Sequence, residues 1–490
     1  MFLFSQPLIK FYAWQHRFSS NEEWKSGTPK IISLLGDSDY DTLFDPLKGF
    51  GLKTAAAWEK RDWQVRSFFK TGNFDKETHY NLFLSGLTPY ARVYLNNTFL
   101  FESDNYFKAY NYTIEKLIKR DAVNELRIDL PSPTLNAELE YKKDAINYPS
   151  DNEESNKKVS QFLRMPPMCF GWDICPRLMP DRLPKEIYIR RWDKMNIENL
   201  YVTTDSISTN KAYLKLEAEI ESDFTGLGEI ELAIADGNNI VLKKTETIQL
   251  KKGKNNFEKK IELQEIKLWF PNGLSHGKAE EPFLYKVFCK ISSGNIQVTK
   301  EENFGIRKVN LIREKDVFGE NFYFKVNGEK IFIKGANYVP DLLDFQRNYS
   351  TKKFKETILK AKDAGFIMIR VWGGGNYLNE EQLNICDEAG IMVWQDFIFS
   401  GTMYPGNEKF LKNVQEEAIH QVKAYKKHPC LALWCGNNEI EVAWKNWGWQ
   451  EKYKIHGKDS IHLWKAYKKI FNEILPNTIR KYDPGTSYIS

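Results

Sequence analysis

Hydrophobic and polar residues alternate with a period of two along most of the first 308 residues. The alternation is clear in NLFLSGL (81–87), ARVYLNNTFL (91–100) and NELRIDLP (124–131), and it is typical of strands with one buried face. It predicts mostly strands, in a jelly-roll β-sandwich, over residues 1–195. The polar segment 136–158 interrupts the pattern and predicts a long surface loop.

The same pattern continues over residues 196–308, where turns such as ADGNN and KKGKNN separate the strands. The expected strands are NLYVTTD, AYLKLEAEIES, EIELAIAD, NNFEKKIEL and FLYKVFCKIS. Short strands at this spacing predict a small immunoglobulin-like β-sandwich.

The pattern changes near residue 309, after which apolar strands alternate with amphipathic helices. The expected strands are IFIKGANYV (331–339), FIMIRVW (366–372), IMVWQDF (391–397), CLALWC (430–435) and SYIS (487–490), and the expected helices are 350–365, 379–390, 408–427 and 460–481. Ser350 is the expected N-cap of the first helix, and Gly365 is its expected stop.

Nearly continuous apolar strands that alternate with helices predict a parallel sheet covered by helices, so the whole chain is of the multidomain β plus α/β class. A doubly wound sheet usually carries a glycine-rich phosphate turn after its first strand, and GANYVPD is not one. A (β/α)8 barrel has eight strands and about 250 residues, whereas residues 309–490 supply only five strands.

Composition excludes several classes of function. The chain has 490 residues, with 70 Lys and Arg against 65 Asp and Glu, and the small net charge of +5 is spread along it, so nucleic-acid binding is not expected. No apolar run is long enough to span a membrane. The high aromatic content, 14%, with 14 Trp, hints at a sugar site.

Six scattered cysteines and seven histidines predict mostly free, buried thiols and no metal cluster, and no cofactor is expected. The N-terminus lacks the basic region and the small-residue cleavage site of a signal peptide, which favours a cytoplasmic location over a periplasmic, secreted or lysosomal one.

Polar and aromatic residues lie at the C-terminal ends of four of the predicted parallel strands, where a (β/α)8 barrel carries its catalytic groups. They are Asn337 with Asp341, Arg370 with Trp372, Trp394 with Gln395 and Asp396, and Asn437 with Asn438 and Glu439. Four such ends in succession predict a lined pocket. Glu439 is either an acid in this pocket or a carboxylate favoured at a helix N-terminus. The Trp rings either stack on a sugar or fill the mouth of the sheet, and Arg370 is expected to pair with Asp396 or another carboxylate.

Several of these segments resemble the β-mannosidases of glycoside hydrolase family 2. The resemblance rests on ARVYLNNTFLFESDNYFKAYNY (91–112), FGWD (170–173) with Arg164 before it, FIKGANYVPDLLDF (332–345), RVWGGGNYLNEEQLNICDEAGIMVWQDFIFSGTMYP (370–405) and WCGNNE (434–439). The segments follow one another in a single order over nearly the whole chain. The resemblance implies a jelly-roll domain, an immunoglobulin-like domain and the first five strands of a (β/α)8 barrel, over residues 1–195, 196–308 and 309–490.

The resemblance also implies roles for particular residues. Glu439 is the expected general acid/base, and Asn438 is expected to contact the sugar 2-hydroxyl. Trp372 is expected to line the glycone subsite, and Trp172 and Asp173 approach it from the jelly roll. Trp394 and Asp396 also match the motif for substrate binding. The family continues after this Asp with Trp-Gly-Pro, whereas this chain has Ile-Cys-Pro at 174–176, which changes the expected shape of the loop.

The implied activity is retaining hydrolysis of terminal non-reducing β-D-mannose from oligosaccharides, which needs an acid/base and a nucleophile about 5 to 5.5 Å apart. The acid needs a raised pKa, for which Trp434 and Cys435 are candidate apolar walls. The family's nucleophile is a Glu at the seventh barrel strand, and this sequence ends at the fifth, so no nucleophile is assigned and Glu441 is not put in its place. We expect an incomplete portion of an active enzyme; a genuine 490-residue protein is expected to be catalytically dead.

Two alternatives remain at this point. One is another family 2 glycosidase, such as a β-galactosidase or β-glucuronidase. The other is a truncated, non-catalytic sugar-binding protein. The aglycone and the oligomeric state have no signature in the sequence.

Overall fold

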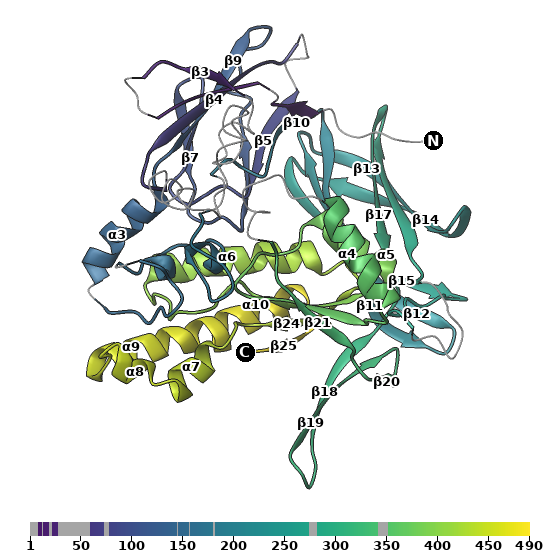
Figure 1. Ribbon diagram of the computed structural model, residues 1–490. Coiled ribbons are helices and arrows are strands. Elements are labelled where there is room, and N and C mark those ends of the chain that lie inside the picture. Colours follow the sequence, from purple (N-terminus) through teal and green to yellow (C-terminus); the bar gives the residue numbers. More distant parts are fainter. Residues whose placement is uncertain are drawn as a thin grey trace.

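The computed structural model describes residues 8–11, 13–18, 22–27, 59–72, 78–144, 146–155, 157–179, 182–273, 282–341 and 351–490. Figure 1 shows two β-rich regions and a parallel sheet with helices around it. The first region lies above the helices of residues 408–482, and the second lies on the right, beside the helices of residues 351–389.

The first region is a sandwich of two antiparallel sheets with the strand orders β1-β10-β5-β8 and β3-β2-β4-β9-β6-β7. Its strands are β1 (Leu8–Lys10), β2 (Trp14–Arg17), β3 (Lys25–Gly27), β4 (Trp63–Lys70), β5 (His79–Ser85), β6 (Arg92–Leu95), β7 (Thr98–Glu102), β8 (Ala109–Thr113), β9 (Val123–Leu130) and β10 (Glu186–Trp192). Alternate residues of β9 are buried, as the sequence pattern predicts. The predicted strand region 91–100 is a hairpin, because Asn96 and Asn97 both take positive φ values, 50° and 65°, that suit a two-residue turn.

The prediction of a surface loop over residues 136–158 is wrong for its first half. Helix α3 (Pro133–Asp144) occupies it, and its N-terminus is capped by the Ser132 hydroxyl, which accepts a hydrogen bond from the Leu135 N–H at 3.2 Å. Ala137 is one of few buried residues in α3, so the helix lacks the apolar stripe that a sequence pattern reveals. Ser150 and Glu153 are also buried rather than exposed, close to the 3-10 helices η1 (Ser160–Phe162) and η2 (Pro167–Phe170).

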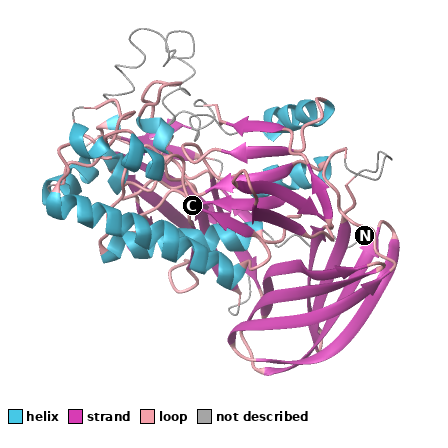
Figure 2. Ribbon diagram, turned by 90° about the horizontal axis from the view of Figure 1, so that it is seen from below, coloured by secondary structure: helices cyan, strands magenta, loops and turns pink. Residues whose placement is uncertain are grey.

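The second region is a sandwich of the sheets β11-β12-β15 and β14-β13-β16-β17, seen at the lower right of Figure 2. Its strands are β11 (Met195–Ser208), β12 (Lys211–Ser222), β13 (Gly226–Asp236), β14 (Asn239–Leu250), β15 (Gly253–Gln264), β16 (Tyr285–Ser293) and β17 (Ile296–Phe304). The five predicted strands are present. Strands β14 and β17 lie at sheet edges and are largely exposed, so their sequences carry little apolar signal.

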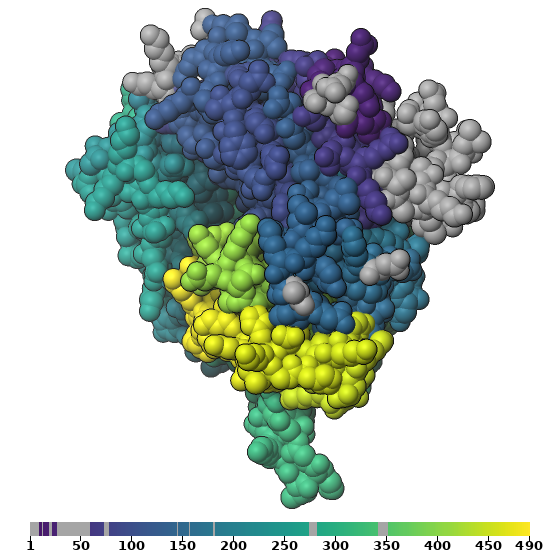
Figure 3. Space-filling view, turned by 90° about the vertical axis from the view of Figure 1, so that its left-hand side faces the viewer, coloured from purple at the N-terminus to yellow at the C-terminus, as the bar shows by residue number. Residues whose placement is uncertain are grey.

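An antiparallel sheet connects this sandwich to the rest of the chain. It contains β18 (Val309–Lys315), β19 (Glu320–Val326) and β20 (Glu329–Ile331), and the β18–β19 hairpin projects from the body of the molecule in Figures 1 and 3. The predicted strand 331–339 is therefore divided, because β20 ends at its first residue and a parallel strand begins at Gly335.

The parallel sheet contains β21 (Gly335–Tyr338), β22 (Met368–Val371), β23 (Met392–Asp396), β24 (Leu431–Cys435) and β25 (Ser487–Ile489), paired in sequence order. The helices that accompany it are α4 (Thr351–Asp363), α5 (Glu380–Ala389), α6 (Glu408–Tyr425), α7 (Ile440–Asn446), α8 (Trp449–Lys452), α9 (Gly457–Lys468), a π-helical segment (Lys469–Ile474) and α10 (Leu475–Tyr482). The predicted strands and the first three predicted helices are present within a few residues. The predicted N-cap Ser350 lies outside the described residues, whereas Gly365 follows α4 with φ +78°.

A buried ion pair anchors the start of β24 to helix α5. His428 Nδ1 lies 2.6 Å from Asp387 Oδ2, and Asp387 Oδ1 accepts the Cys430 N–H at 2.9 Å. Burial lowers the pKa of His428, but Asp387 and Glu380, whose Oε2 lies 3.4 Å from His428 Nε2, raise it to about 9, so the imidazole is a cation at neutral pH.

Candidate active site

The C-terminal ends of β22, β23 and β24 lie side by side and bring together side chains that are distant in sequence. The parallel register pairs Arg370 with Trp394, and Asp396 with Cys435. Because side chains alternate along a strand, Trp394 and Asp396 lie on one face of β23 and Gln395 on the other. The first face therefore gathers the polar groups that the sequence pattern places at the strand ends.

Asp396 is the most buried of these groups, with no exposed surface. Arg370 donates to both of its carboxylate oxygens, from Nη2 at 2.7 Å and from Nε at 3.2 Å. The Trp394 indole N–H and the Gly373 N–H donate to the same carboxylate, each at 3.0 Å. Burial raises the pKa of Asp396, and Arg370 with these donors opposes that rise. The expected pairing of Arg370 with Asp396 is present.

Arg370 also connects Asp396 to the predicted acid. Its Nη2 donates to Asn438 Oδ1 at 2.8 Å, and Asn438 Nδ2 donates to Glu439 Oε2 at 3.0 Å. The Asn438 N–H is held by the Phe399 carbonyl at 2.9 Å. A continuous chain of hydrogen bonds therefore runs from a buried carboxylate to an exposed one, and it fixes both ends of the Asn438 amide.

Glu439 occupies an unusual backbone conformation. Its φ is 62°, in the left-handed region, which costs a residue other than glycine about 1 to 2 kcal/mol. Glu439 directly precedes α7, but its side chain makes no capping hydrogen bond to that helix. The carboxylate instead accepts from Asn438, at the exposed surface of the strand end. Backbone strain of this kind is concentrated at functional sites.

Two tryptophans from different parts of the chain meet beside this chain of hydrogen bonds. Trp172, from the segment that follows η2, packs edge-to-face on Trp372, with ring centroids 4.9 Å apart. A Cβ atom at Gly374 would lie 2.1 Å from the Trp372 ring, and one at Gly401 would lie 2.8 Å from the Trp172 ring, so both rings require glycine neighbours. Asp173 follows Trp172 and is exposed.

Three residues singled out in the sequence lie elsewhere. Asp341 forms an exposed ion pair with Lys353 at 2.9 Å. Gln395 points to the helix side, where its Oε1 accepts from the Tyr425 hydroxyl at 2.9 Å. The expectation that Trp434 forms a wall beside the acid is wrong, because the alternation of the strand directs its ring away from the site, onto Phe397 and Tyr425.

Cys435 lies next to the polar groups of the site, as expected for a wall residue. Burial raises its pKa to about 12, so it remains a neutral thiol. All six cysteines are within the described residues, and all are free; five are buried and Cys175 is partly exposed.

Asn337 is expected at a strand end, but its contact with Arg370 is not; its Oδ1 accepts from Arg370 Nη1 at 3.4 Å. Phe399, whose carbonyl accepts the Asn438 N–H, has no predicted role. The signal for Phe399 is the apolar run that continues past the end of β23, where Phe397, Ile398 and Phe399 are fully buried in a loop.

Within the described residues, no group of three or more His, Cys, Asp or Glu side chains is arranged to hold a metal ion. Nor does this part of the chain contain a helix with the length and apolarity needed to cross a membrane.

The fold and the site together define a multidomain protein in which a β-sandwich delivers an aromatic side chain to a carboxylate site at the ends of parallel strands. Comparison with known proteins agrees with this description. Residues 14–181 match the family model "Glycosyl hydrolase 2 galactose-binding domain-like", and residues 195–307 match "Glycosyl hydrolases family 2". The chain belongs to glycoside hydrolase family 2.

The similar proteins include β-mannosidases from several organisms. The chain is 30% identical to a β-mannosidase of Bos taurus over 376 residues, which are 74% of this chain and 42% of the relative. It is 27% identical to β-mannosidase B of Aspergillus terreus, over 91% of this chain and 52% of the relative. The chain thus spans about half the length of the curated relatives it matches.

Solved structures extend the likeness to the whole described fold. The β-D-mannosidase of Dictyoglomus thermophilum superimposes with a TM-score of 0.86 at 29% identity, covering 98% of this chain and 57% of that one. A β-glucuronidase of Bacteroides uniformis, at 15% identity and a TM-score of 0.70, covers 99% of this chain and 52% of that one and shares the fold alone.

Proposed function

We propose that the protein acts as a retaining exo-β-mannosidase, which removes terminal non-reducing β-D-mannose residues from oligosaccharides. The observation that carries the proposal is the chain of hydrogen bonds from Asp396 through Arg370 and Asn438 to Glu439, beside the Trp172–Trp372 pair. The similarity to β-mannosidases at 27 to 30% identity supports mannose over other sugars.

We also propose a domain organisation of a jelly roll (1–195), an immunoglobulin-like sandwich (196–308) and the first five strands of a (β/α)8 barrel (309–490). The described parallel strands pair in sequence order, without the reversal of order that marks a doubly wound sheet. The placement of polar groups at the C-terminal strand ends supports the barrel as well.

In this proposal Glu439 is the general acid that protonates the glycosidic oxygen as the bond breaks. As this bond breaks, a second enzyme carboxylate bonds to the anomeric carbon and forms a glycosyl-enzyme ester. A water molecule, from which the Glu439 carboxylate takes a proton, then attacks the anomeric carbon and releases the second carboxylate. Asn438 contacts the 2-hydroxyl, and its amide is oriented for this by Arg370 and Glu439. Trp172, Asp173 and Trp372 contact the glycone, and aromatic faces suit the apolar face of a sugar ring.

Trp394 and Asp396 take part in substrate binding at the end of β23. Both oxygens of Asp396 accept hydrogen bonds, from Arg370, Trp394 and Gly373. We therefore do not propose Asp396 as the nucleophile. The nucleophile is left unassigned.

The test uses the full-length protein with Glu439→Ala and, as a matched carboxylate control, Glu441→Ala. Aryl β-D-mannoside, β-D-galactoside and β-D-glucuronide hydrolysis is compared first; faster cleavage of either of the last two would overturn the mannose assignment. Glu439→Ala is expected to lower kcat on poor leaving groups by about 10²- to 10⁴-fold. Azide is expected to restore turnover of an activated mannoside and to yield β-mannosyl azide.

Glu441 lies on α7, where it pairs with Lys445 and accepts a hydrogen bond from the Tyr467 hydroxyl at 3.3 Å. Neither contact involves Asn438 or Arg370, so replacement of Glu441 is expected to leave turnover nearly unchanged. Equal loss in the two variants, or no rescue of Glu439→Ala by azide, would remove Glu439 from the acid/base role.

A further inference from the structure

A four-residue turn presents Trp172 and Asp173 to the candidate site. We call it the Trp172 turn (residues 172–175); it is closed by the Trp172 N–H donating to the Cys175 carbonyl at 2.9 Å and by the Cys175 N–H donating back at 3.3 Å. Asp173 and Ile174 at its tip are exposed, and Ile174 is 61% exposed. The tip of the turn therefore makes few contacts of its own.

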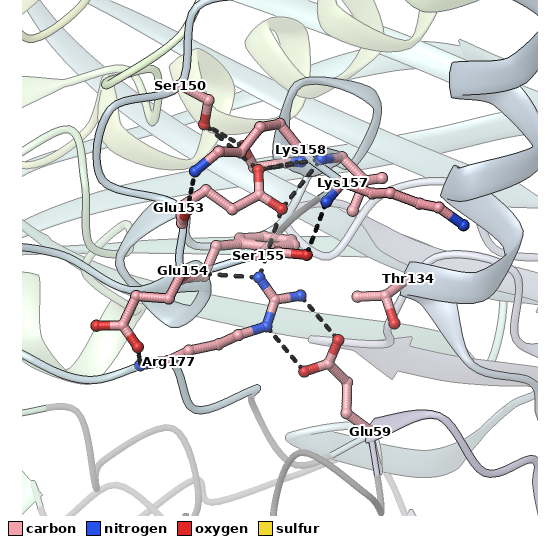
Figure 4. A network of polar contacts seen from close by, with 12 residues as sticks. Glu59, Thr134, Ser150, Glu153, Glu154, Ser155, Lys157, Lys158 and Arg177 are labelled. Carbon is pink, nitrogen blue, oxygen red and sulfur yellow. Dashed lines mark hydrogen bonds and ion pairs between the residues drawn. The ribbon is translucent and has the colours of Figure 1, made fainter.

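Arg177 lies two residues after this turn, and its side chain bonds to two separate segments (Figure 4). Its guanidinium donates to both oxygens of Glu59, from Nε at 3.0 Å and from Nη2 at 2.8 Å. Its Nη1 reaches Glu153 Oε1 and the Phe170 carbonyl, at 3.4 and 3.5 Å. The Arg177 backbone N–H donates to Glu154 Oε2 at 3.3 Å.

The carboxylate of Glu153 continues this network toward the opposite side of Trp172. It accepts the N–H groups of Val159 and Ser160 at 3.0 to 3.1 Å and the Ser150 hydroxyl at 3.4 Å. Ser150 in turn pairs through its backbone with Thr402, which adjoins the glycine that packs against the Trp172 ring. The same arginine is thus connected to both the turn and the surface on which the Trp172 ring rests.

We propose that Arg177 is a positioning residue that fixes the Trp172 turn, and thereby the glycone-binding side of the site. Only the expected effect of Arg177 on catalysis rests on the proposed function. A planar guanidinium can bind two carboxylates on different segments and a carbonyl at once, whereas a lysine ammonium cannot reproduce the bidentate contact. The Glu59 and Glu153 side chains are 6% and 1% exposed, so loss of the arginine leaves two carboxylates with little access to water.

Cys175 provides a readout of the turn that does not depend on turnover. It is the partly exposed cysteine of the six, and its Sγ donates to the Met168 carbonyl at 3.6 Å. Opening of the turn exposes this thiol, so its rate of alkylation by iodoacetamide, measured by peptide mass spectrometry, reports local mobility. In the wild-type full-length protein, a non-hydrolysable aryl 1-thio-β-D-mannoside is expected to slow the labelling of Cys175.

The principal variant is Arg177→Lys, which keeps the positive charge between the two carboxylates. We expect Cys175 labelling to rise about tenfold, which corresponds to about 1.4 kcal/mol in the opening of the turn. We also expect KM for an aryl β-mannoside to rise about tenfold, with kcat within threefold of wild type for a substrate whose leaving group needs no protonation. Arg66→Lys is the matched control, since Arg66 bonds Gln15 and Glu125 on the outer part of the sandwich.

A second variant, Glu154→Ala, removes the acceptor of the Arg177 N–H without leaving a buried charge, because Glu154 is exposed. We expect a smaller rise in labelling, about two- to threefold, in a protein with wild-type thermal stability. Cys175 labelling at the wild-type rate in both variants would overturn the positioning role. Faster labelling in a protein that cleaves no β-mannoside would refute the proposed function while leaving the role of Arg177 intact.

Discussion

A buried ion pair joins the first sandwich to the helix that covers the parallel sheet, and it offers a quantitative test of the packing. Arg164 Nε and Nη2 donate to the two oxygens of Glu417 on α6, at 2.8 and 2.6 Å, and both side chains are 1% exposed. Glu417 also accepts from Asn105 Nδ2 and from the Tyr377 hydroxyl, each at 2.8 Å. The Arg164 guanidinium lies 3.7 Å from the centroid of the Phe399 ring, the residue whose carbonyl holds Asn438.

The expected cost of breaking this pair follows from its burial. Two unit charges 4 Å apart attract by about 4 kcal/mol at an effective dielectric constant of 20. Removal of one partner also leaves the other charge desolvated, and such single substitutions cost about 3 to 5 kcal/mol. Arg164→Met leaves Glu417 with only neutral donors, and Glu417→Leu leaves a buried cation, so each is expected to destabilise the protein by this amount.

The double variant removes both charges and leaves only neutral groups unpaired. We therefore expect its loss to be smaller than the sum of the two single losses by at least about 2 kcal/mol. The assay is urea unfolding of the full-length protein, followed by circular dichroism and tryptophan fluorescence, with the first transition compared among the four proteins. Single losses below about 1 kcal/mol, or additivity within about 0.5 kcal/mol, would refute the reasoning that the two charges stabilise each other.

Three further predictions concern the site and the sheet. Asp396→Asn is expected to lower kcat/KM about 30- to 1000-fold, since Arg370 loses a charge-assisted bidentate partner worth about 2 to 4 kcal/mol. Steady-state kinetics measure this loss, and a loss under threefold would contradict the prediction. The stability contributed by His428 is fully present below its unfolded pKa of about 6.5 and is lost as the pH rises through its folded pKa of about 9. His428→Gln is therefore expected to remove up to about 3 kcal/mol of pH-dependent stability, measured by denaturation between pH 6 and 10. If the unfolding free energies of the variant and the wild type change in parallel with pH, His428 does not contribute in this way. Gly374→Ala places a Cβ 2.1 Å from the Trp372 ring and is expected to destabilise the protein by about 1 to 3 kcal/mol. The displaced ring is also expected to change the near-ultraviolet circular dichroism spectrum, whereas an unchanged spectrum would mean that the ring has not moved.

Much of the site was predictable because strand ends are local features. The apolar run ending in WQD places Trp394 and Asp396 on one face, and LALWCGNNE places Asn438 and Glu439 after the next strand. Since parallel strands end at one edge, the pattern predicts that Arg370 pairs with Asp396 or another carboxylate, and the pair with Asp396 is present. By the alternation of side chains along a strand, Trp434 lies on the face opposite Cys435, which is the helix side of the sheet.

Local alternation and composition suffice to predict the order of strands and helices, the strand ends that carry polar groups and the mostly free cysteines. They do not predict which distant residues meet. Arg177 contacts Glu59, 118 positions away, and Arg164 contacts Glu417, 253 positions away. Helix α3 also lacks an apolar stripe, so the periodicity of the sequence does not predict it. Contacts over such separations leave no periodic pattern, because they arise when whole domains pack and buried charges must find partners.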